Sequence, residues 1–163
     1  MMQNDVYIAL GSNLGDRRDN LNQAIEKMTD LLHCRLDRSS FWQSQPDGMA
    51  DDAGLFMNAV VRATTDMSVR NLFGRLQKIE EQMGRPRIHQ KNISRIIDLD
   101  IILFGTDQVK EPGLVVPHPR FHERLFVLLP LSELAADLNL PGCSLSVDDL
   151  IAAAPAIDIS RLS

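Results

Sequence analysis

Cysteine and aromatic residues are scarce in this chain of 163 residues. It has two cysteines, Cys34 and Cys143, and only 5% of its residues are phenylalanine, tryptophan or tyrosine. Two cysteines so far apart argue against a disulfide framework or a zinc site, so a reduced, cytoplasmic setting is expected. The segments predicted below as strands lack the pattern of aromatic residues on which RNA bases stack, and this argues against an RNA-binding module.

Long apolar runs are also missing. The apolar stretch Leu125–Leu131 is far shorter than the ~20 residues that a membrane-spanning helix needs. The first residues, Met1–Asp5, lack the basic and then apolar pattern of a secretory signal peptide. We therefore expect no membrane partner and no export.

Positive charge is in the minority. The chain has 17 lysines and arginines against 22 aspartates and glutamates, a formal net charge of −5. A general affinity for nucleic acid is therefore not expected. The length and the hydrophobic content of 44% fit a single domain over residues 1–163 with a sizeable core, and a monomer is the simplest expectation.

Hydrophobic periodicity predicts an α+β fold. The main strands are predicted at residues 6–10, 33–43, 56–65 and 97–104, and the helices between them at about 16–32 and 69–83. Asp16 and Ser68 are suited to cap these two helices. The order β-α-β-β-α-β is that of a ferredoxin-like domain, an antiparallel sheet with helices packed against it. Smaller elements are predicted at residues 114–116 (strand), 131–138 and 146–154 (helical turns).

The turn Gly11–Gly15 lies between the first strand and the first helix. A glycine-containing turn at the start of a helix can cradle a phosphate. Glycine and asparagine are also common in such turns for backbone reasons alone. The turn by itself therefore leaves both interpretations open.

The stretch from Gly84 to Phe104 carries the strongest chemical signal. Asp98 and Asp100 lie on an otherwise apolar strand, and the alternation of side chains puts both carboxylates on one face, about 6–7 Å apart. The other face is expected to meet the core through Ile97, Leu99, Ile101 and Leu103. Two acids are costly to bury without a compensating cation, and carboxylate oxygens suit Mg²⁺.

The residues just before this acidic pair are basic. They comprise Arg85, Arg87, His89, Lys91 and Arg95. Cationic side chains bind the phosphates that Mg²⁺ usually accompanies, so the stretch predicts a metal–polyphosphate site. The alternative is a solvated basic loop followed by a strand whose outer face is wet.

Two further segments carry candidate binding residues. Residues 44–55 form a long loop rich in proline, glycine and aspartate, and such loops are often functional. Phe56 and Asn58 follow it on a strand and face the same way, although Asn58 also suits a strand-edge hydrogen bond. His118 lies between two prolines on a rigid segment near Arg124, where it is either a phosphate ligand or structural.

Six motifs run through nearly the whole chain. They are Gly11-Ser-Asn-Leu-Gly-Asp-Arg17, Phe56-Met-Asn58, Glu80 with Gly84-Arg-Pro-Arg87, Arg95-Ile-Ile-Asp-Leu-Asp-Ile101, Val116-Pro-His-Pro119 and Arg124-Leu-Phe-Val-Leu128. In this order they resemble the motifs of the 6-hydroxymethyl-7,8-dihydropterin pyrophosphokinase family. Each motif alone is weak, whereas the ordered set is very specific. The family fold is a ferredoxin-like domain, in agreement with the predicted element order.

The resemblance implies an enzyme of folate biosynthesis. It would transfer the β,γ-pyrophosphoryl unit of ATP to the hydroxymethyl group of 6-hydroxymethyl-7,8-dihydropterin, giving AMP and the pterin diphosphate. Two Mg²⁺ ions held by Asp98 and Asp100 would neutralise the phosphates, and Arg85 and Arg95 would stabilise the transferred group. No general base is evident, so positioning and metal charge would supply most of the catalysis.

The resemblance also implies the two substrate sites. The ATP-binding residues would be Gln77 and Glu80 near the nucleoside, and Arg87, Lys91, His118 and Arg124 on the phosphates. The pterin ring would lie between Phe56 and Phe126, with polar contacts from Ser44 and Asn58.

The chain departs from the family pattern in both loops. The family's Trp-Gly-Pro-Arg before the acidic strand is replaced by Asn92-Ile-Ser-Arg95, and its Thr-x-Pro-hydrophobic-Gly by Ser44-Gln-Pro-Asp-Gly48. An aromatic residue that would cover ATP or the pterin is thereby missing. The alternative to the full enzyme is a divergent paralogue that binds nucleotide or pterin without turnover, or with altered specificity.

Overall fold

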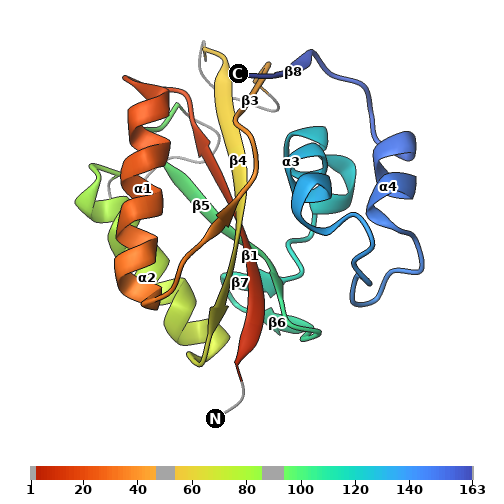
Figure 1. Cartoon of the computed structure of the whole chain (residues 1–163), viewed down its shortest axis with the longest axis horizontal. Coiled ribbons are helices and arrows are strands. Elements are labelled where there is room, and N and C mark those ends of the chain that lie inside the picture. The colour runs from red at the N-terminus through yellow and green to blue at the C-terminus, as the bar shows by residue number, and fades with distance from the viewer. Residues whose placement is uncertain (1–2, 47–53, 86–93, 163) are drawn as a thin grey trace.

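An antiparallel sheet with helices on both faces forms the centre of the protein (Figure 1). The computed structural model describes residues 3–46, 54–85 and 94–162. The strands are β1 (Asn4–Ser12), β2 (Asp37–Arg38), β3 (Trp42–Ser44), β4 (Phe56–Thr65), β5 (Asp98–Phe104), β6 (Val109–Glu111), β7 (Leu114–Val116) and β8 (Ile159–Arg161). The helices are α1 (Arg17–Leu32), α2 (Val69–Gln82), α3 (Leu125–Ala135) and α4 (Val147–Ala153), with a 3₁₀ turn at Phe121–Glu123.

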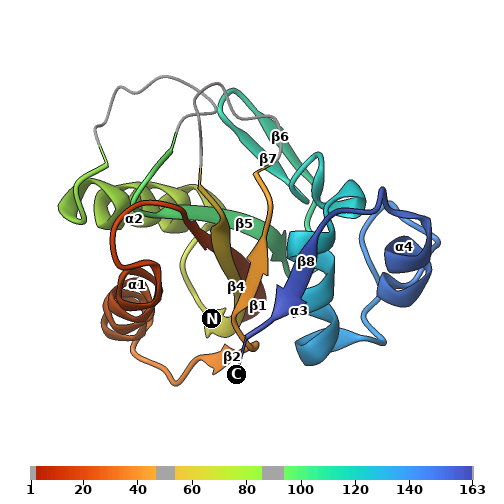
Figure 2. The same ribbon diagram turned by 90° about the horizontal axis from the view of Figure 1, so that it is seen from above.

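The strand order confirms the predicted ferredoxin-like α+β fold. The main sheet has the order β5-β1-β4-β3-β8, all neighbours are antiparallel, and β2 also pairs with β4. The first four strands of this order are those of the predicted βαββαβ unit, and β8 extends the sheet beyond β3 (Figure 2). The strands β6 and β7 form a separate hairpin.

The helices α1 and α2 cover one face of the sheet, as predicted. Asp16 accepts a hydrogen bond from the Asp19 N–H at 3.0 Å and Ser68 accepts one from the Asn71 N–H at 3.1 Å, so both expected caps form. The helices bury one apolar stripe each, comprising Leu21, Ala24 and Met28 in α1 and Leu72, Leu76 and Ile79 in α2. This periodic burial explains why the sequence pattern located both helices.

The helices α3 and α4 cover part of the opposite face. The helix predicted at residues 131–138 begins six residues earlier, at Leu125. The unbroken apolar run there has no clear helical period, and proline, here Pro130, is uncommon inside a helix, so the pattern gives no helix start at Leu125. Within the described ranges, no helix is both long and apolar enough to span a membrane.

The strand predicted at residues 33–43 is largely wrong. Only the short strands β2 and β3 form, and Ser39 lies between them. The Ser39 hydroxyl accepts a hydrogen bond from the Val60 N–H at 2.9 Å, in place of a backbone carbonyl. This side chain interrupts the ladder, which a strand pattern in the sequence does not reveal. Strand β8 was not predicted, because three mostly polar residues carry no strand signal.

A bulge in β5 changes which side chains share a face. The register against β1 shifts at Ile102, which has no partner residue in β1. Leu99 and Ile101 face α1 and α2 as predicted. The extra residue reverses the alternation, so Leu103 packs on the α3 side and its predicted placement is wrong.

The two-sided core predicts a clear difference between two leucines. Leu128 in α3 is fully buried, whereas Leu145 is 46% exposed. Leu128→Ala should lower the free energy of unfolding by about 2–5 kcal/mol, because it leaves a cavity under the sheet. Leu145→Ala should change it by less than about 0.5 kcal/mol. Equal losses in chemical denaturation would contradict a core on the α3 side.

Candidate active site

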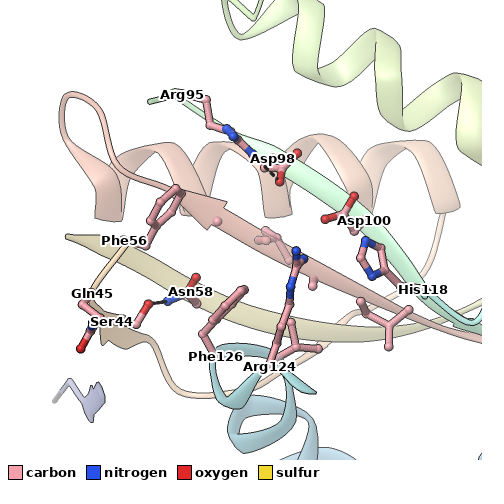
Figure 3. Close-up of a pocket in the computed structure, with 15 residues that line it drawn as sticks. Ser44, Gln45, Phe56, Asn58, Arg95, Asp98, Asp100, His118, Arg124 and Phe126 are labelled. Atoms are coloured by element: carbon pink, nitrogen blue, oxygen red, sulfur yellow. Dashed lines mark hydrogen bonds and ion pairs between the residues drawn. The ribbon is translucent and has the colours of Figure 1, made fainter. Parts of the chain in front are cut away.

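A pocket opens on the α3 side of the sheet, where β1, β4 and β5 lie side by side (Figure 3). Its lining residues come from most of the chain: Ala9, Leu10, Gly11, Ser44, Gln45, Phe56, Asn58, Arg95, Asp98, Asp100, Ile102, His118, Arg124, Phe126 and Val127. One end holds the two acids with Arg95, and the other end holds the two phenylalanines with Asn58 and Ser44, while Arg124 lies beside Phe126. The pocket therefore joins a charged half to an aromatic half.

The sheet register sets the spacing between these halves. Gly11 on β1 lies opposite Asp98 on one side and Asn58 on the other, so the three form one row across the sheet. Ala9 and Asp100 belong to the next row on the same face. Neighbouring strands are about 4.8 Å apart, which places the backbones of Asp98 and Asn58 about 10 Å apart. A small molecule lying across β1 can reach both.

Both oxygens of Asp98 are bound by arginines. Arg85 Nη1 lies 2.5 Å from Oδ1, and Arg95 Nη1 lies 3.0 Å from Oδ2. Arg85 also pairs with Glu80 at 2.7 Å, and Glu80 accepts the Leu99 N–H at 3.0 Å. The side chains in these ion pairs are only 12–24% exposed. This network fixes the start of β5 against the end of α2.

The three clustered carboxylates differ in how readily they ionise. Burial opposes ionisation of Asp98, but Arg85 and Arg95 outweigh it and lower its pKa. Burial, together with the charges of Asp98 and Glu80, raises the pKa of Asp100 to about 8. Burial and Asp98 also raise the pKa of Glu80 to about 7. Two of the three carboxylates thus resist ionisation, which is the expected electrostatic signature of a site that accepts a cation.

The donor set of Asp98 and Asp100 fits Mg²⁺ held together with phosphates. No described residue hydrogen-bonds or ion-pairs with the Asp100 carboxylate, and a carboxylate such as Asp98 has about four lone-pair directions, of which the arginine contacts use two. The described residues contain no group of three or more potential ligands for a metal ion. Mg²⁺ commonly binds one or two carboxylates and takes its other ligands from substrate phosphates and water.

His118 is neutral in this pocket. Burial, with Arg124 next in importance, lowers its pKa to about 4. The Arg120 N–H lies 3.2 Å from His118 Nδ1, so this nitrogen is the acceptor and the proton belongs on Nε2. His118 can therefore donate to a phosphate oxygen, and Arg124 supplies positive charge in the same pocket.

The aromatic half combines an apolar slot with one oriented amide. Phe56 and Phe126 both line it, and the Arg124 guanidinium lies 5.5 Å from the centre of the Phe126 ring. Asn58 Nδ2 donates to Ser44 Oγ at 2.8 Å. This bond fixes the amide, and its carbonyl oxygen lies beside Gly11 on the pocket floor. A flat ring with polar edges matches such a slot.

The predicted site residues thus fall into four groups. The pocket brings together Ser44, Phe56, Asn58, Arg95, Asp98, Asp100, His118, Arg124 and Phe126. Arg85 and Glu80 support Asp98, while Gln77 is exposed on α2 and does not line the pocket, so its contact with ATP stays a prediction. Arg87 and Lys91 lie outside the described residues.

Two residues in or next to the pocket were not among the predicted site residues. Gln45 lines the pocket, and its side-chain oxygen accepts the Asp158 N–H at 2.8 Å while its own N–H donates to Asp158 O at 3.1 Å. Asn13, in the predicted phosphate turn, binds Ser94 and Arg95. Both contacts join segments about 80 or more residues apart, and only the turn motif around Asn13 offered a hint.

Comparison with known proteins gives consistent matches. A family model described as 7,8-dihydro-6-hydroxymethylpterin-pyrophosphokinase matches residues 7–136. The chain is 40% identical over 158 residues to the 2-amino-4-hydroxy-6-hydroxymethyldihydropteridine pyrophosphokinase of Pseudomonas aeruginosa, covering 96% of both chains. It is 39% identical to that of Haemophilus influenzae over 137 residues, 83% of this chain and 84% of the relative.

The fold is also found in longer proteins. The crystal structure of wild-type Plasmodium falciparum HPPK-DHPS with SDX-DHP matches with a TM-score of 0.72 and 14% identity. The match covers 93% of this chain and 44% of that chain. At this identity, the likeness bears on the fold alone.

The raised pKa of Asp100 predicts how stability changes with pH. Between the ordinary carboxyl range and about pH 8 the folded protein holds a proton at Asp100 that the unfolded chain has released. The free energy of unfolding of the ligand-free protein should therefore fall as pH rises through this window, by at most about 1.4 kcal/mol per pH unit for one proton. Asp100→Asn should flatten the slope between pH 7 and 8, above the pKa of about 7 of Glu80. Denaturant titrations at each pH test this, with the exposed Asp107→Asn as control; a variant that keeps the wild-type slope would contradict it.

Proposed function

The chain belongs to the 7,8-dihydro-6-hydroxymethylpterin-pyrophosphokinase family, and we propose that it transfers pyrophosphate from ATP to 6-hydroxymethyl-7,8-dihydropterin. The single observation that carries this proposal is the joining of two half-sites in one pocket. The acidic pair with its arginines lies one strand away from Gly11, and the aromatic slot lies one strand away on the other side. A polyphosphate and a flat heterocycle would therefore meet above β1.

The proposed reaction is an in-line displacement at phosphorus. The hydroxymethyl oxygen of the pterin forms a bond to the β-phosphorus of ATP, and the bond from that phosphorus to the oxygen bridging the α-phosphate breaks. AMP leaves with the bridging oxygen and its electron pair, and the hydroxyl proton is released to solvent. Phosphoryl transfer of this kind depends mainly on positioning and charge stabilisation.

The cationic side chains supply that stabilisation in our proposal. Arg95 and Arg124 line the pocket and would bind phosphate oxygens, and His118 would donate through Nε2. Arg85 lies behind Asp98 and would orient that carboxylate while adding positive charge. Fixed donors in a half-enclosed pocket stabilise developing charge more than water does.

Asp98 and Asp100 would hold Mg²⁺ that arrives with ATP. When bound, the metal neutralises phosphate charge and so lowers the repulsion against the attacking oxygen. The two carboxylates share one face of β5 and one pocket, and no described residue hydrogen-bonds or ion-pairs with Asp100, although the charges of Arg124 and Arg85 act on it. The number of ions, two by the family resemblance, stays a prediction.

The aromatic half would bind the pterin. Phe56 and Phe126 would contact the faces of the ring, and the oriented Asn58 carbonyl would accept a hydrogen bond from its edge. Ser44 and Gln45 line the same pocket, and Gln45 is hydrogen-bonded to Asp158. Gln45 stands at the variable position of the family's loop pattern, directly after the altered residue Ser44.

Some expectations from the sequence stay predictions. They are a cytoplasmic location, a monomeric state, no nucleic-acid partner and a single domain over residues 1–163.

The proposed function predicts release of AMP that requires both a divalent metal and the pterin. AMP should form from ATP in the presence of Mg²⁺ and hydroxymethyl-dihydropterin, and fall to background when EDTA replaces Mg²⁺. Asp100→Asn should lower kcat by at least about 100-fold, because it removes a metal ligand, whereas the exposed Asp107→Asn should keep wild-type activity. Tight ATP binding with no AMP for the authentic pterin would favour the non-catalytic paralogue instead.

The aromatic slot predicts a selective effect on one substrate. Phe126→Ala should raise KM for the pterin about tenfold or more, since a stacked ring contributes on the order of 1–2 kcal/mol. KM for ATP should change by less than about threefold in a steady-state assay. Phe126→Leu, which keeps apolar volume without an aromatic face, should give a smaller rise. Equal increases in both KM values would argue against a pterin slot at Phe126.

A further inference from the structure

Asn13 is a buried polar residue in the turn between β1 and α1. It is 7% exposed, and its polar groups bond to the segment just before β5. Its side-chain oxygen accepts the Arg95 N–H at 2.7 Å, and its own N–H donates to the Arg95 carbonyl at 3.1 Å. Its Nδ2 donates to the Ser94 hydroxyl at 3.1 Å. Both main-chain polar groups of Arg95 are thus bound by one residue.

These two hydrogen bonds fix the Arg95 backbone relative to the floor of the pocket. Asn13 follows directly on the end of β1, whose Gly11 lies in the row between Asp98 and Asn58. From the fixed backbone the Arg95 guanidinium reaches Asp98 at 3.0 Å. An arginine side chain has several rotatable bonds, so the place of its backbone decides where its charge can act.

Another asparagine, Asn20 in the first turn of α1, bonds to the same connection in a different way. Its Nδ2 donates to Oγ of Ser12, the last residue of β1, at 3.1 Å and to the Leu14 carbonyl at 2.8 Å. Asn20 therefore stabilises the turn itself and has no bond to Arg95. It is a matched control for Asn13, with the same side chain and a similar number of hydrogen bonds.

We infer that Asn13 is a positioning residue for the transfer reaction, acting through Arg95. This inference rests on the proposed function, in which Arg95 contacts the transferred phosphates. Asn13 itself touches no reacting atom in this scheme. Its effect belongs on kcat, because a misplaced arginine stabilises the transition state less while the remaining phosphate ligands still bind ATP.

The first test compares two asparagine variants. Asn13→Ala should lower kcat by about 10- to 100-fold, the range expected when a catalytic group shifts by up to about 1 Å, with KM for ATP within about threefold. Asn20→Ala, which also removes two hydrogen bonds at this connection but none to Arg95, should keep kcat within about threefold. Equal losses of kcat in both variants would overturn the inference, because a general loosening of the turn would then explain them.

A double-mutant cycle tests whether Asn13 acts through Arg95. In an Arg95→Ala background the Asn13→Ala change should no longer alter kcat, since the side chain that it positions is gone. If Asn13→Ala instead lowers kcat in the Arg95→Ala background by the same factor as in the wild type, Asn13 acts independently of Arg95 and the inference is overturned. If Asn13→Ala does not fold, Asn13→Ser, which keeps a shorter polar group, replaces it in the same cycle.

Amide hydrogen exchange gives a readout that does not need turnover. Asn13→Ala removes the acceptor of the Arg95 N–H, so exchange at Arg95 should speed up about tenfold, the usual worth of one hydrogen bond. The Leu99 amide, which bonds to Glu80, should exchange as in the wild type. Unchanged exchange at Arg95 would contradict the inference that Asn13 fixes the Arg95 backbone. A wild-type protein that releases no AMP would instead refute the proposed function, whatever the exchange shows.

Discussion

The need to compensate three clustered carboxylates governs the structure around the pocket. Glu80, Asp98 and Asp100 come from the end of α2 and the start of β5, and burial penalises the charge on each. Arg85 and Arg95 compensate the charge of Asp98, whereas Asp100 has no ion pair among the described residues and its pKa is raised to about 8. Removing a partner from such a group leaves an uncompensated charge, so these residues depend on one another. A cation that approaches from the pocket would supply the missing compensation and favour ionisation of Asp100.

Side-chain size along β1 determines where the pocket opens. Tyr7, Ala9 and Gly11 alternate onto the α3 face of the sheet. Tyr7 is buried under the α3 cluster, Ala9 is smaller, and Gly11 has no side chain. A Cβ at Gly11 would already lie 3.6–3.7 Å from Asn58 and Phe56. The core is therefore filled at one end of the strand and hollow at the other, with Asp98 and Asn58 on either side of the hollow.

Local patterns predicted much of this arrangement. Asp16 and Ser68 cap their helices, and Asp98 and Asp100 share one face of β5. Each of these features depends on residue types and spacing within a few residues of one helix or strand, so the sequence is enough to predict it. The bond of Gln45 to Asp158 and the interruption of the ladder at Ser39 depend on segments that meet only after folding. The bulge at Ile102 also escaped prediction, because one extra residue in an apolar strand leaves the composition unchanged.

The side chains of the two arginines on Asp98 differ in the carboxylates that they contact, and this difference matters when a polyphosphate enters. The Arg85 guanidinium lies between Glu80 and Asp98, and the Arg85 backbone N–H donates to the Glu80 carbonyl at 2.9 Å, whereas the Arg95 guanidinium pairs with Asp98. The backbone of Arg95 is held by uncharged hydrogen bonds to Asn13, which a phosphate does not weaken. Its guanidinium can therefore leave Asp98 for a phosphate oxygen while its anchor stays in place. In the proposed reaction, this would free one oxygen of Asp98 for the metal at the moment that the substrate supplies the compensating charge.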